Sequence, residues 1–362
     1  MNAIMTKIKV AIAGLGNCAS SLIQGIYFYS NKTKEVPGLL HNKIGSYYPK
    51  NIEIVAAFDI DERKVGLDVS KAIFAKPNNT PIFYKNIPNI GVKVMRAPTL
   101  DGYSSHMTDY DESIRFLESK ERNVDVEKIL RIAKPDILIN YLPVGSQKAT
   151  EYYVNCCLNA GVSFINAIPV FICSKKEYID KFKEKNLVCI GDDIKSQIGS
   201  TIVHRVLANL FKERGAKIIN TYQLNVGGNT DFLNMLDRKR LKSKKISKTE
   251  AVKSELPKYV ENSVHIGPSD YIPFLNDNKI AYIKIDGVGF GGLPIVIDLK
   301  LSVIDSPNSA GIMIDVIRCA KLAIDRGIFG YLEEISSYGF KHPLKQTNDY
   351  LAKKKLNAFI KG

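Results

Sequence analysis

The feature that most constrains the fold of this chain is a glycine turn near its N-terminus. Residues 9–29, KVAIAGLGNCASSLIQGIYFY, have the pattern of a buried strand, a glycine turn and a helix. Gly14 permits the tight turn, and Gly16 lets a pyrophosphate approach the backbone where the helix begins. Ala19 stands where this motif often has a third glycine. The motif predicts a dinucleotide site, and a glycine turn without a nucleotide is the alternative.

A carboxylate at the end of the second predicted strand fits the same motif. IEIVAAFDID (52–61) is that strand, and Asp59 stands where a carboxylate would hold the adenosine ribose. Asp59 follows Gly14 by 45 residues, whereas about 20 is usual. A long excursion at 30–51, rich in Lys, Gly, Pro and Asn, accounts for the excess. An aspartate rather than a basic residue favours NAD over NADP.

Strands and helices alternate along the first part of the chain. The expected strands that follow are 92–98, 136–143, 162–169 and 187–193, and the expected helices are 126–133, one from about 146 and one at about 197–214. Such alternation indicates an α/β fold with a doubly wound parallel sheet and right-handed crossovers.

The pattern changes after residue 216. Long strands at 217–229, 281–287 and 294–305 follow without the earlier alternation, and a basic helical stretch runs to about 253. The period-two pattern of the last two strands indicates an antiparallel sheet with one exposed face. Helical periodicity returns at 308–327. A chain of 362 residues is also too long for one ordinary core, so we expect two domains or a large insertion.

Composition limits the kind of protein and its partners. No run of about 18 apolar residues occurs and the N-terminus lacks a signal-peptide pattern, so we expect a cytoplasmic protein without a membrane partner. The six cysteines form no CxxC pair, which argues against a structural zinc site. A net charge of +14 favours anionic partners: nucleic acid, anionic lipid or phosphorylated substrates. The basic cluster at 238–248 has no interleaved aromatic residues, which favours a solvated helix face over a nucleic-acid site.

Three aspartates stand where a predicted strand or turn leads into a helix. Asp192 and Asp193 end the strand at 187–193, and that end of a parallel sheet faces the ligand crevice. The pair can bind a divalent cation or orient a sugar hydroxyl. Asp305 begins the turn DSPNSAG. For Asp193 and Asp305 a helix N-cap is the alternative.

Two lysines of the basic cluster are spaced for one helix face. Lys244 and Lys248 are four residues apart, which places them on the same side of a helix. Ser247 and Glu250, however, form a plausible capping box, which would start the helix between the two lysines. Taken alone, the pair is best interpreted as part of a solvated face.

Six segments together resemble the prokaryotic inositol-phosphate synthases. They are GLGNCASS (14–21), NYLPVGS (140–146), GDDIKSQ (191–197), QLNVGGNTDFLNML (223–236), SKKISK (243–248) and DSPNSAG (305–311). The resemblance implies an NAD-dependent isomerase that converts glucose 6-phosphate to 1D-myo-inositol 3-phosphate without net redox change. It also implies a homotetramer. The implied domains are a Rossmann-type NAD-binding domain at 1–215, an inserted α+β catalytic and tetramerisation domain at 216–307, and C-terminal helices at 308–362 that return to the first domain.

The resemblance also assigns roles to individual residues. The four active-site lysine positions of the family match Lys244, Lys248, Lys279 and Lys341. Positions around the nicotinamide and the substrate match Asp193, Ser196, Asp231 and Lys244. Further cofactor positions match Gly14, Gly16, Asn17, Cys18, Asp59 and Asp68. Asp193 and Asp305 match positions that help to hold a divalent or monovalent cation.

The expected chemistry follows from the implied substrate. Oxidation of carbon 5 with NAD makes the proton on carbon 6 acidic, its removal gives an enolate that attacks the aldehyde at carbon 1, and the ketone is then reduced. Negative charge develops on oxygen at each carbonyl stage, where ammonium groups stabilise it. One alternative is an ordinary NAD-dependent dehydrogenase of a phosphorylated or acidic substrate. Another is a nucleotide sensor that binds nucleic acid through residues 238–248.

Overall fold

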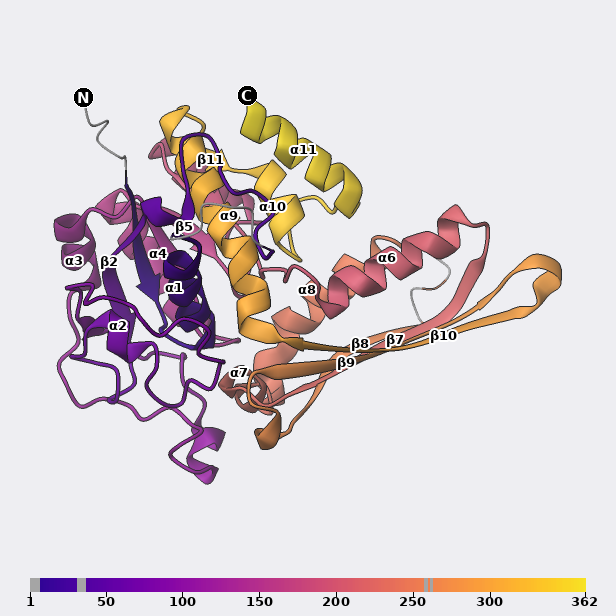
Figure 1. Ribbon diagram of the computed structural model, residues 1–362, viewed down its shortest axis with the longest axis horizontal. Coiled ribbons are helices and arrows are strands. Elements are labelled where there is room, and N and C mark those ends of the chain that lie inside the picture. The colour runs from indigo at the N-terminus through magenta and orange to yellow at the C-terminus, as the bar shows by residue number, and fades with distance from the viewer. Residues whose placement is uncertain (1–6, 31–36, 257–259, 261–262) are drawn as a thin grey trace.

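A parallel sheet covered by helices and a long arm beside it make up the molecule (Figure 1). The structure is a computed structural model that describes residues 7–30, 37–256, 260 and 263–362. Residues 1–6, part of the N-terminus used in the signal-peptide prediction, lie outside the described residues. So do residues 31–36 of the predicted excursion.

The parallel sheet has the strand order β11-β6-β5-β4-β1-β2-β3 in the described residues. Its strands are β1 (Ile8–Ala13), β2 (Ile52–Asp59), β3 (Val94–Arg96), β4 (Ile137–Asn140), β5 (Ser163–Asn166), β6 (Val188–Ile190) and β11 (Gly330–Tyr331). Strands β4 and β5 are buried along their whole length because both faces of the sheet are covered. The order reverses between β1 and β4, and ligands bind such sheets at this switch point, beyond the carboxyl ends of the strands. The prediction of a Rossmann-type doubly wound sheet is confirmed.

Helices cover the two faces of the parallel sheet and form a separate core on each. On one face α1 (Asn17–Ser30) packs against α9 (Asp305–Asp325). The other face carries α3 (Val126–Ala133), α4 (Gln147–Ala160) and α5 (Lys176–Glu184). The remaining helices of this part are α2 (Val69–Ala72), α10 (Glu333–Gly339) and α11 (Asp349–Lys361). Helix α9 is apolar on most sides because it is buried between the sheet and the segments around Ile44 and Leu356.

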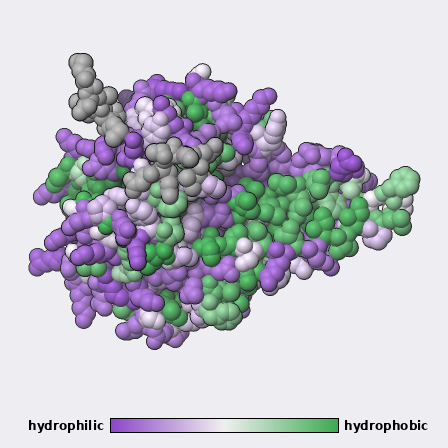
Figure 2. Space-filling model, in the orientation of Figure 1, coloured by the Kyte–Doolittle hydropathy of each residue, from purple (hydrophilic) through white to green (hydrophobic). Residues whose placement is uncertain are grey.

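The arm is a second sheet with helices along it (Figure 1). Its strands are β7 (Lys217–Gly227), β8 (Val264–Tyr271), β9 (Asn278–Val288) and β10 (Pro294–Ile304), in the order β10-β9-β7-β8. Its helices are α6 (Ser200–Glu213), α7 (Thr230–Asn234) and α8 (Lys242–Lys253). Short 3₁₀ turns occur in both parts of the molecule, at Pro49–Asn51, Ser105–Asp109, Arg238–Leu241, Pro273–Leu275 and Phe290–Gly292. Figure 2 shows apolar side chains gathered over much of the viewed face of the arm.

Three details differ from the sequence-based expectations. The second sheet is not purely antiparallel, because β8 pairs parallel with β7. Strand β8 was not predicted because Gly267 and Pro268 interrupt its strand pattern. Strand β11 was not predicted because it has only two residues. The capping box at Ser247 and Glu250 is wrong: α8 begins at Lys242 and carries both Lys244 and Lys248. Ser247 instead donates a hydrogen bond to Asp193.

The division of the chain into domains at 215/216 and 307/308 stays a prediction. Helix α6, which that division places in the first domain, packs Ala208 and Phe211 against Ile283 and Ile285 of the second sheet. A division before Ser200 would keep this small core whole. Within the described part of the chain, no helix is long and apolar enough to cross a membrane.

Candidate active site

A cleft with several charged side chains lies where the carboxyl end of the parallel sheet meets the arm. Its walls come from the glycine turn, the loops after β4 and β6, the first turns of α7 and α9, and one side of α8. The predicted site residues that line it are Gly16, Asn17, Cys18, Asp193, Ser196, Asp231, Lys244, Lys248, Lys279, Asp305 and Lys341. All four predicted lysines therefore share one cavity with the glycine turn.

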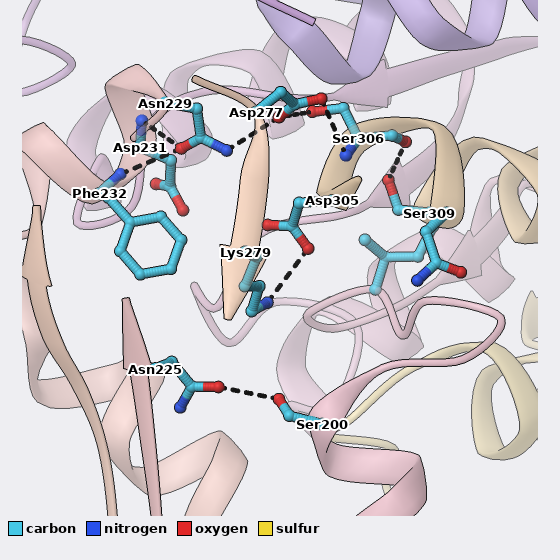
Figure 3. Close-up of polar contacts among 12 residues, drawn as sticks. Ser200, Asn225, Asn229, Asp231, Phe232, Asp277, Lys279, Asp305, Ser306 and Ser309 are labelled. Atoms are coloured by element: carbon cyan, nitrogen blue, oxygen red, sulfur yellow. Dashed lines mark hydrogen bonds and ion pairs between the residues drawn. The ribbon is translucent and has the colours of Figure 1, made fainter. Parts of the chain in front are cut away.

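Three of the four lysines pair with an aspartate of the cleft. The pairs are Lys341–Asp193 (2.8 Å), Lys244–Asp231 (2.7 Å) and Lys279–Asp305 (3.1 Å), measured from Nζ to the nearer carboxylate oxygen. Figure 3 shows the last of these pairs. Asp305 is therefore not an N-cap: it is the first residue of α9, and its side chain contacts the lysine of β9. Each carboxylate holds an ammonium in a defined place.

Burial and opposite charge compete in these pairs. Burial raises the pKa of Asp193, but the positive charges of Lys341 and Lys244 outweigh it and hold this pKa below its usual value. Burial lowers the pKa of Lys244, but Asp231 and Asp193 outweigh it and hold this pKa above its usual value. Asp193 is consequently ionised and Lys244 protonated at neutral pH.

Lys248 differs from the other three lysines. It lies one turn after Lys244 on α8 and is 3% exposed. Among the described residues its ammonium has no hydrogen-bond or ion-pair partner, unlike the ammonium groups of Lys244, Lys279 and Lys341. Burial and the positive charges of those three lysines lower the pKa of Lys248 well below its usual value. An ammonium in this setting is stabilised by a negative group that a ligand brings. Because Lys244 and Lys248 are buried, the solvated-face interpretation is wrong for both.

The loop after β6 turns Asp193 into the cleft and Asp192 away from it. Asp192 is fully buried, and its carboxylate accepts hydrogen bonds from the backbone and side chain of Ser174. Asp193 has a φ of 63°, which non-glycine residues rarely adopt. The Lys341 N–H donates to the Asp193 carbonyl at 2.7 Å and holds this backbone. Asp193 is not the N-cap of α6, a position that Gly199 occupies.

The glycine turn leaves space for an anionic group. Gly14 has a φ of 91°, and a Cβ there would lie 2.7 Å from the Tyr141 carbonyl oxygen, so the turn requires glycine. A Cβ at Gly16 would meet nothing within 4 Å. The N–H groups of the following first turn of α1 have no acceptor within the helix, and they favour a bound anion. Burial raises the pKa of the nearby Cys18 thiol to about 12, with Asp277 adding to the shift, so the thiol stays protonated.

Two carboxylates proposed for the cofactor, Asp59 and Asp68, do not line the cleft. Asp59 Oδ2 accepts a hydrogen bond from Leu15 N at 2.6 Å and anchors the glycine turn. Asp68 is the N-cap of α2, and it accepts from Ser70 N at 2.9 Å and from Gly91 N at 2.8 Å. Their contacts with a cofactor stay predictions.

Asp277, which was not predicted from the sequence, joins the arm to the first turn of α9. It is 1% exposed, and Oδ1 accepts hydrogen bonds from Asn229 Nδ2 at 3.0 Å and Ser306 Oγ at 2.8 Å (Figure 3). Burial and the neighbouring Asp305 raise the pKa of Asp277 to about 6. Its place two residues before Lys279 is the only signal in the sequence.

Tyr141 is a second residue that the sequence analysis did not single out. It follows β4 and lines the cleft. Its hydroxyl is buried and has no hydrogen-bond partner among the described residues. Buried hydroxyls are normally paired, so this one is free to bond a ligand. The motif NYLPVGS contains it, but no spacing rule distinguishes it from other tyrosines.

The two carboxylates predicted to hold a cation are both in contact with lysines. Asp193 pairs with Lys341 and Asp305 with Lys279. No group of three or more His, Cys, Asp or Glu residues that could hold a metal ion occurs in the described ranges. The described residues thus do not supply a complete metal site by themselves, and the cation stays a prediction.

Comparison with known proteins gives relatives along nearly the whole chain. A family model described as myo-inositol-1-phosphate synthase matches residues 199–306. An inositol-3-phosphate synthase of Mycolicibacterium smegmatis is 50% identical, over 98% of this chain and 98% of that protein. One of Corynebacterium glutamicum is 51% identical, again over 98% of each chain.

Solved structures share the fold. A protein called Ari2 is 31% identical, with a TM-score of 0.78 over 98% of this chain and 100% of that one. A myo-inositol-1-phosphate synthase-related protein from Thermotoga maritima has a TM-score of 0.81 over 98% of each chain at 23% identity, which shows likeness of fold alone. Since relatives half identical to it cover almost its whole length, this enzyme belongs to the inositol-3-phosphate synthase family.

Proposed function

We propose that the enzyme isomerises D-glucose 6-phosphate to 1D-myo-inositol 3-phosphate, with NAD as a recycled cofactor. The observation that carries this proposal is the convergence of Lys244, Lys248, Lys279 and Lys341 on one cleft that also holds the glycine turn. A cleft rich in ammonium groups suits a phosphorylated sugar. The names of the relatives agree with an inositol 3-phosphate product.

The residues of the glycine turn fit a dinucleotide. The open space at Gly16 would accept the pyrophosphate, and the start of α1 would stabilise its charge. Asn17 and Cys18 continue this wall of the cleft, and Ser196 and Asp231 line it with them. When bound, NAD supplies reversible hydride transfer at carbon 5 of the sugar.

The lysines stabilise oxygens that become negative during the reaction. Negative charge develops on an oxygen at three stages: the ketone at carbon 5, the enolate formed from it, and the aldehyde at carbon 1. A fixed ammonium lowers the energy of each stage. Lys244, Lys279 and Lys341 are held by their aspartates before the substrate binds. Lys248 has no such partner among the described residues, so the anionic substrate provides its counter-charge. Asp193 orients Lys341, and Ser247 in turn fixes Asp193.

No step of the proposed reaction is assigned to a cation. Asp193 and Asp305 would each have to share their oxygens with a lysine, and further ligands would have to come from the cofactor or from water. The divalent or monovalent ion that the family resemblance implies therefore stays a prediction about these two aspartates.

We also propose that the enzyme is a cytoplasmic homotetramer that associates through the arm. Exposed apolar side chains on the arm include Phe290, Leu293 and Val296, with Phe290 100% exposed. Apolar surface gathered in this way favours association, and Figure 2 shows its extent on the viewed face. Light scattering of the purified enzyme measures the assembly: a mass near four chains agrees with the proposal, and a monomer contradicts it.

The test of the function is a reaction with glucose 6-phosphate and much less NAD than sugar. We expect many turnovers per NAD, an inositol monophosphate as product, and no lasting NADH absorbance. NADH that accumulates in proportion to product would instead establish an ordinary dehydrogenase. Absence of any product would reject both.

A further inference from the structure

A second cluster of charges, with buried cations and a partly exposed central carboxylate, lies between the arm and the C-terminal segment. It consists of Lys195, Arg205, Glu255 and Asp349. Asp349 lies at its centre: Oδ1 is 2.9 Å from Lys195 Nζ, and Oδ2 is 2.6 Å from Arg205 Nε. Arg205 also lies 2.7 Å from Glu255. The side chains of Lys195 and Arg205 are 2% and 1% exposed, so both cations depend on these carboxylates.

Lys195 connects the cluster to the loop after β6. Its neighbours Asp193 and Ser196 line the cleft, whereas its own side chain does not. The ammonium of Lys195 donates to the Ser337 carbonyl at 3.0 Å and to Asp349, both outside the cleft. The cluster therefore holds the backbone that turns Asp193 toward the substrate.

Arg205 connects the cluster to helix α8. Its guanidinium donates to the Ala251 carbonyl and, at 2.8 Å, to Ser254 Oγ, at the end of the helix that carries Lys244 and Lys248. Arg205 therefore holds the C-terminal end of the helix, and with it the position of Lys244 and Lys248 along the cleft.

The segment before α11 connects the cluster to Lys341. Arg205 donates to the Thr347 carbonyl at 2.7 Å. One residue earlier, Gln346 Nε2 donates to the Lys341 carbonyl at 2.7 Å. The Lys341 segment, whose backbone N–H donates to the Asp193 carbonyl, is thus fixed by the same group of charges.

We propose that Asp349 is a positioning residue for the reaction. A single carboxylate outside the cleft fixes the relative placement of the Asp193 loop, helix α8 and the Lys341 segment, through Lys195 and Arg205. The inference rests on the proposed function, because it concerns the groups which that function uses. Loss of the carboxylate removes the ion-pair partner of Lys195 and leaves Arg205 paired with Glu255, so the two buried cations repel each other and move apart. A displacement of about 1 Å in catalytic groups can cost about 100-fold in rate.

The test is Asp349→Asn in the full-length enzyme, assayed with NAD and glucose 6-phosphate. We expect kcat to fall by about 100-fold, while the affinity for NAD stays near that of the unchanged enzyme, because the glycine turn lies on another element. The matched control is Glu333→Gln. It removes the exposed ion pair between Glu333 and Lys355, which also anchors α11, and it should leave kcat unchanged.

Three results decide the outcome. Wild-type kcat in Asp349→Asn overturns the inference without touching the proposed function, whereas a wild-type enzyme that makes no inositol phosphate rejects the function itself. If Asp349→Asn loses NAD binding as well as turnover, Asp349→Glu decides: it keeps the charge and displaces it by one methylene. A lowered kcat with normal NAD affinity in Asp349→Glu supports positioning, and any other result for this variant overturns it.

Discussion

Lys248→Met and Lys341→Met form a matched test of how the cleft uses its charges. Methionine keeps much of the length of lysine and removes the ammonium. Both changes should lower turnover by about 100- to 1,000-fold, since each removes a donor to developing negative charge. Their effects on the free energy of unfolding should have opposite signs, because Lys341 has an aspartate partner and Lys248 has none among the described residues.

The structure gives the size of each effect. Lys341→Met leaves the carboxylate of Asp193, whose side chain is 5% exposed, without its ion-pair partner. Removing one member of a buried pair costs about 3–5 kcal/mol. Lys248→Met removes a buried charge that three neighbouring lysines repel. Replacement of buried ion pairs by apolar side chains of similar volume ranges from neutral to stabilising by about 4 kcal/mol. We expect Lys248→Met to stabilise within this range.

The stability difference at Lys248 should also depend on pH. The pKa of Lys248 in the folded enzyme lies well below its usual value of 10.5. At any pH between the folded and the usual pKa, the unfolded chain therefore binds more protons than the folded one. The cost of burying Lys248 is therefore present at neutral pH and is lost as the pH rises toward 10.5. The gain from Lys248→Met should shrink accordingly at alkaline pH.

Guanidinium unfolding followed by circular dichroism, at equal protein concentrations and at two pH values, measures these differences. Turnover is measured on the same preparations. A Lys248→Met enzyme that is destabilised as much as Lys341→Met would refute the reasoning, because it would mean that Lys248 has a stabilising partner in the folded enzyme. Wild-type turnover in either variant would remove that lysine from the site.

Three further outcomes follow from single residues. Tyr141→Phe should keep stability within about 0.5 kcal/mol and lower kcat/KM by about tenfold. An unchanged kcat/KM in steady-state kinetics would show that the Tyr141 hydroxyl, which has no partner among the described residues, faces no ligand. Asp59→Ala should weaken NAD binding by about 1–3 kcal/mol by calorimetry, since it frees the Leu15 N–H of the glycine turn. Burial lowers the pKa of His204 to about 4, against the opposing effect of the hydrogen bond between His204 Nδ1 and Gln223 Oε1. The contribution of neutral His204 to stability is therefore present above pH 6.5, and about 3 kcal/mol of it is lost as the pH falls toward 4. His204→Gln should remove this loss, and acid unfolding curves that coincide for both enzymes would contradict it.

The parallel sheet could be predicted from the sequence because its strands are short apolar runs bounded by glycine, proline and polar residues. Burial on both faces requires such runs, as in β1 and β4. The same rule cannot detect β11, whose two residues pair with β6 only because α9 and the chain after it return to the sheet. Strand β8 was not predicted because two of its residues, Gly267 and Pro268, fit a strand poorly.

The cleft was predictable only in part. The glycine turn has a fixed spacing, so Gly14 and Gly16 could be located directly. Lys279 and Lys341 have no pattern of their own, and the resemblance to a family supplied them. Asp277 was beyond sequence reasoning because its importance lies in burial and in partners from distant segments.

In the proposed reaction, one site oxidises and then reduces the same sugar carbon. The most direct measurement follows glucose 6-phosphate deuterated at carbon 5 through the reaction, with much less unlabelled NAD than sugar. If hydride leaves carbon 5 and returns to it, the inositol phosphate formed keeps the deuterium and no NADH accumulates. Deuterium recovered in the reduced cofactor, with NADH rising in step with product, would contradict the account and identify a dehydrogenase.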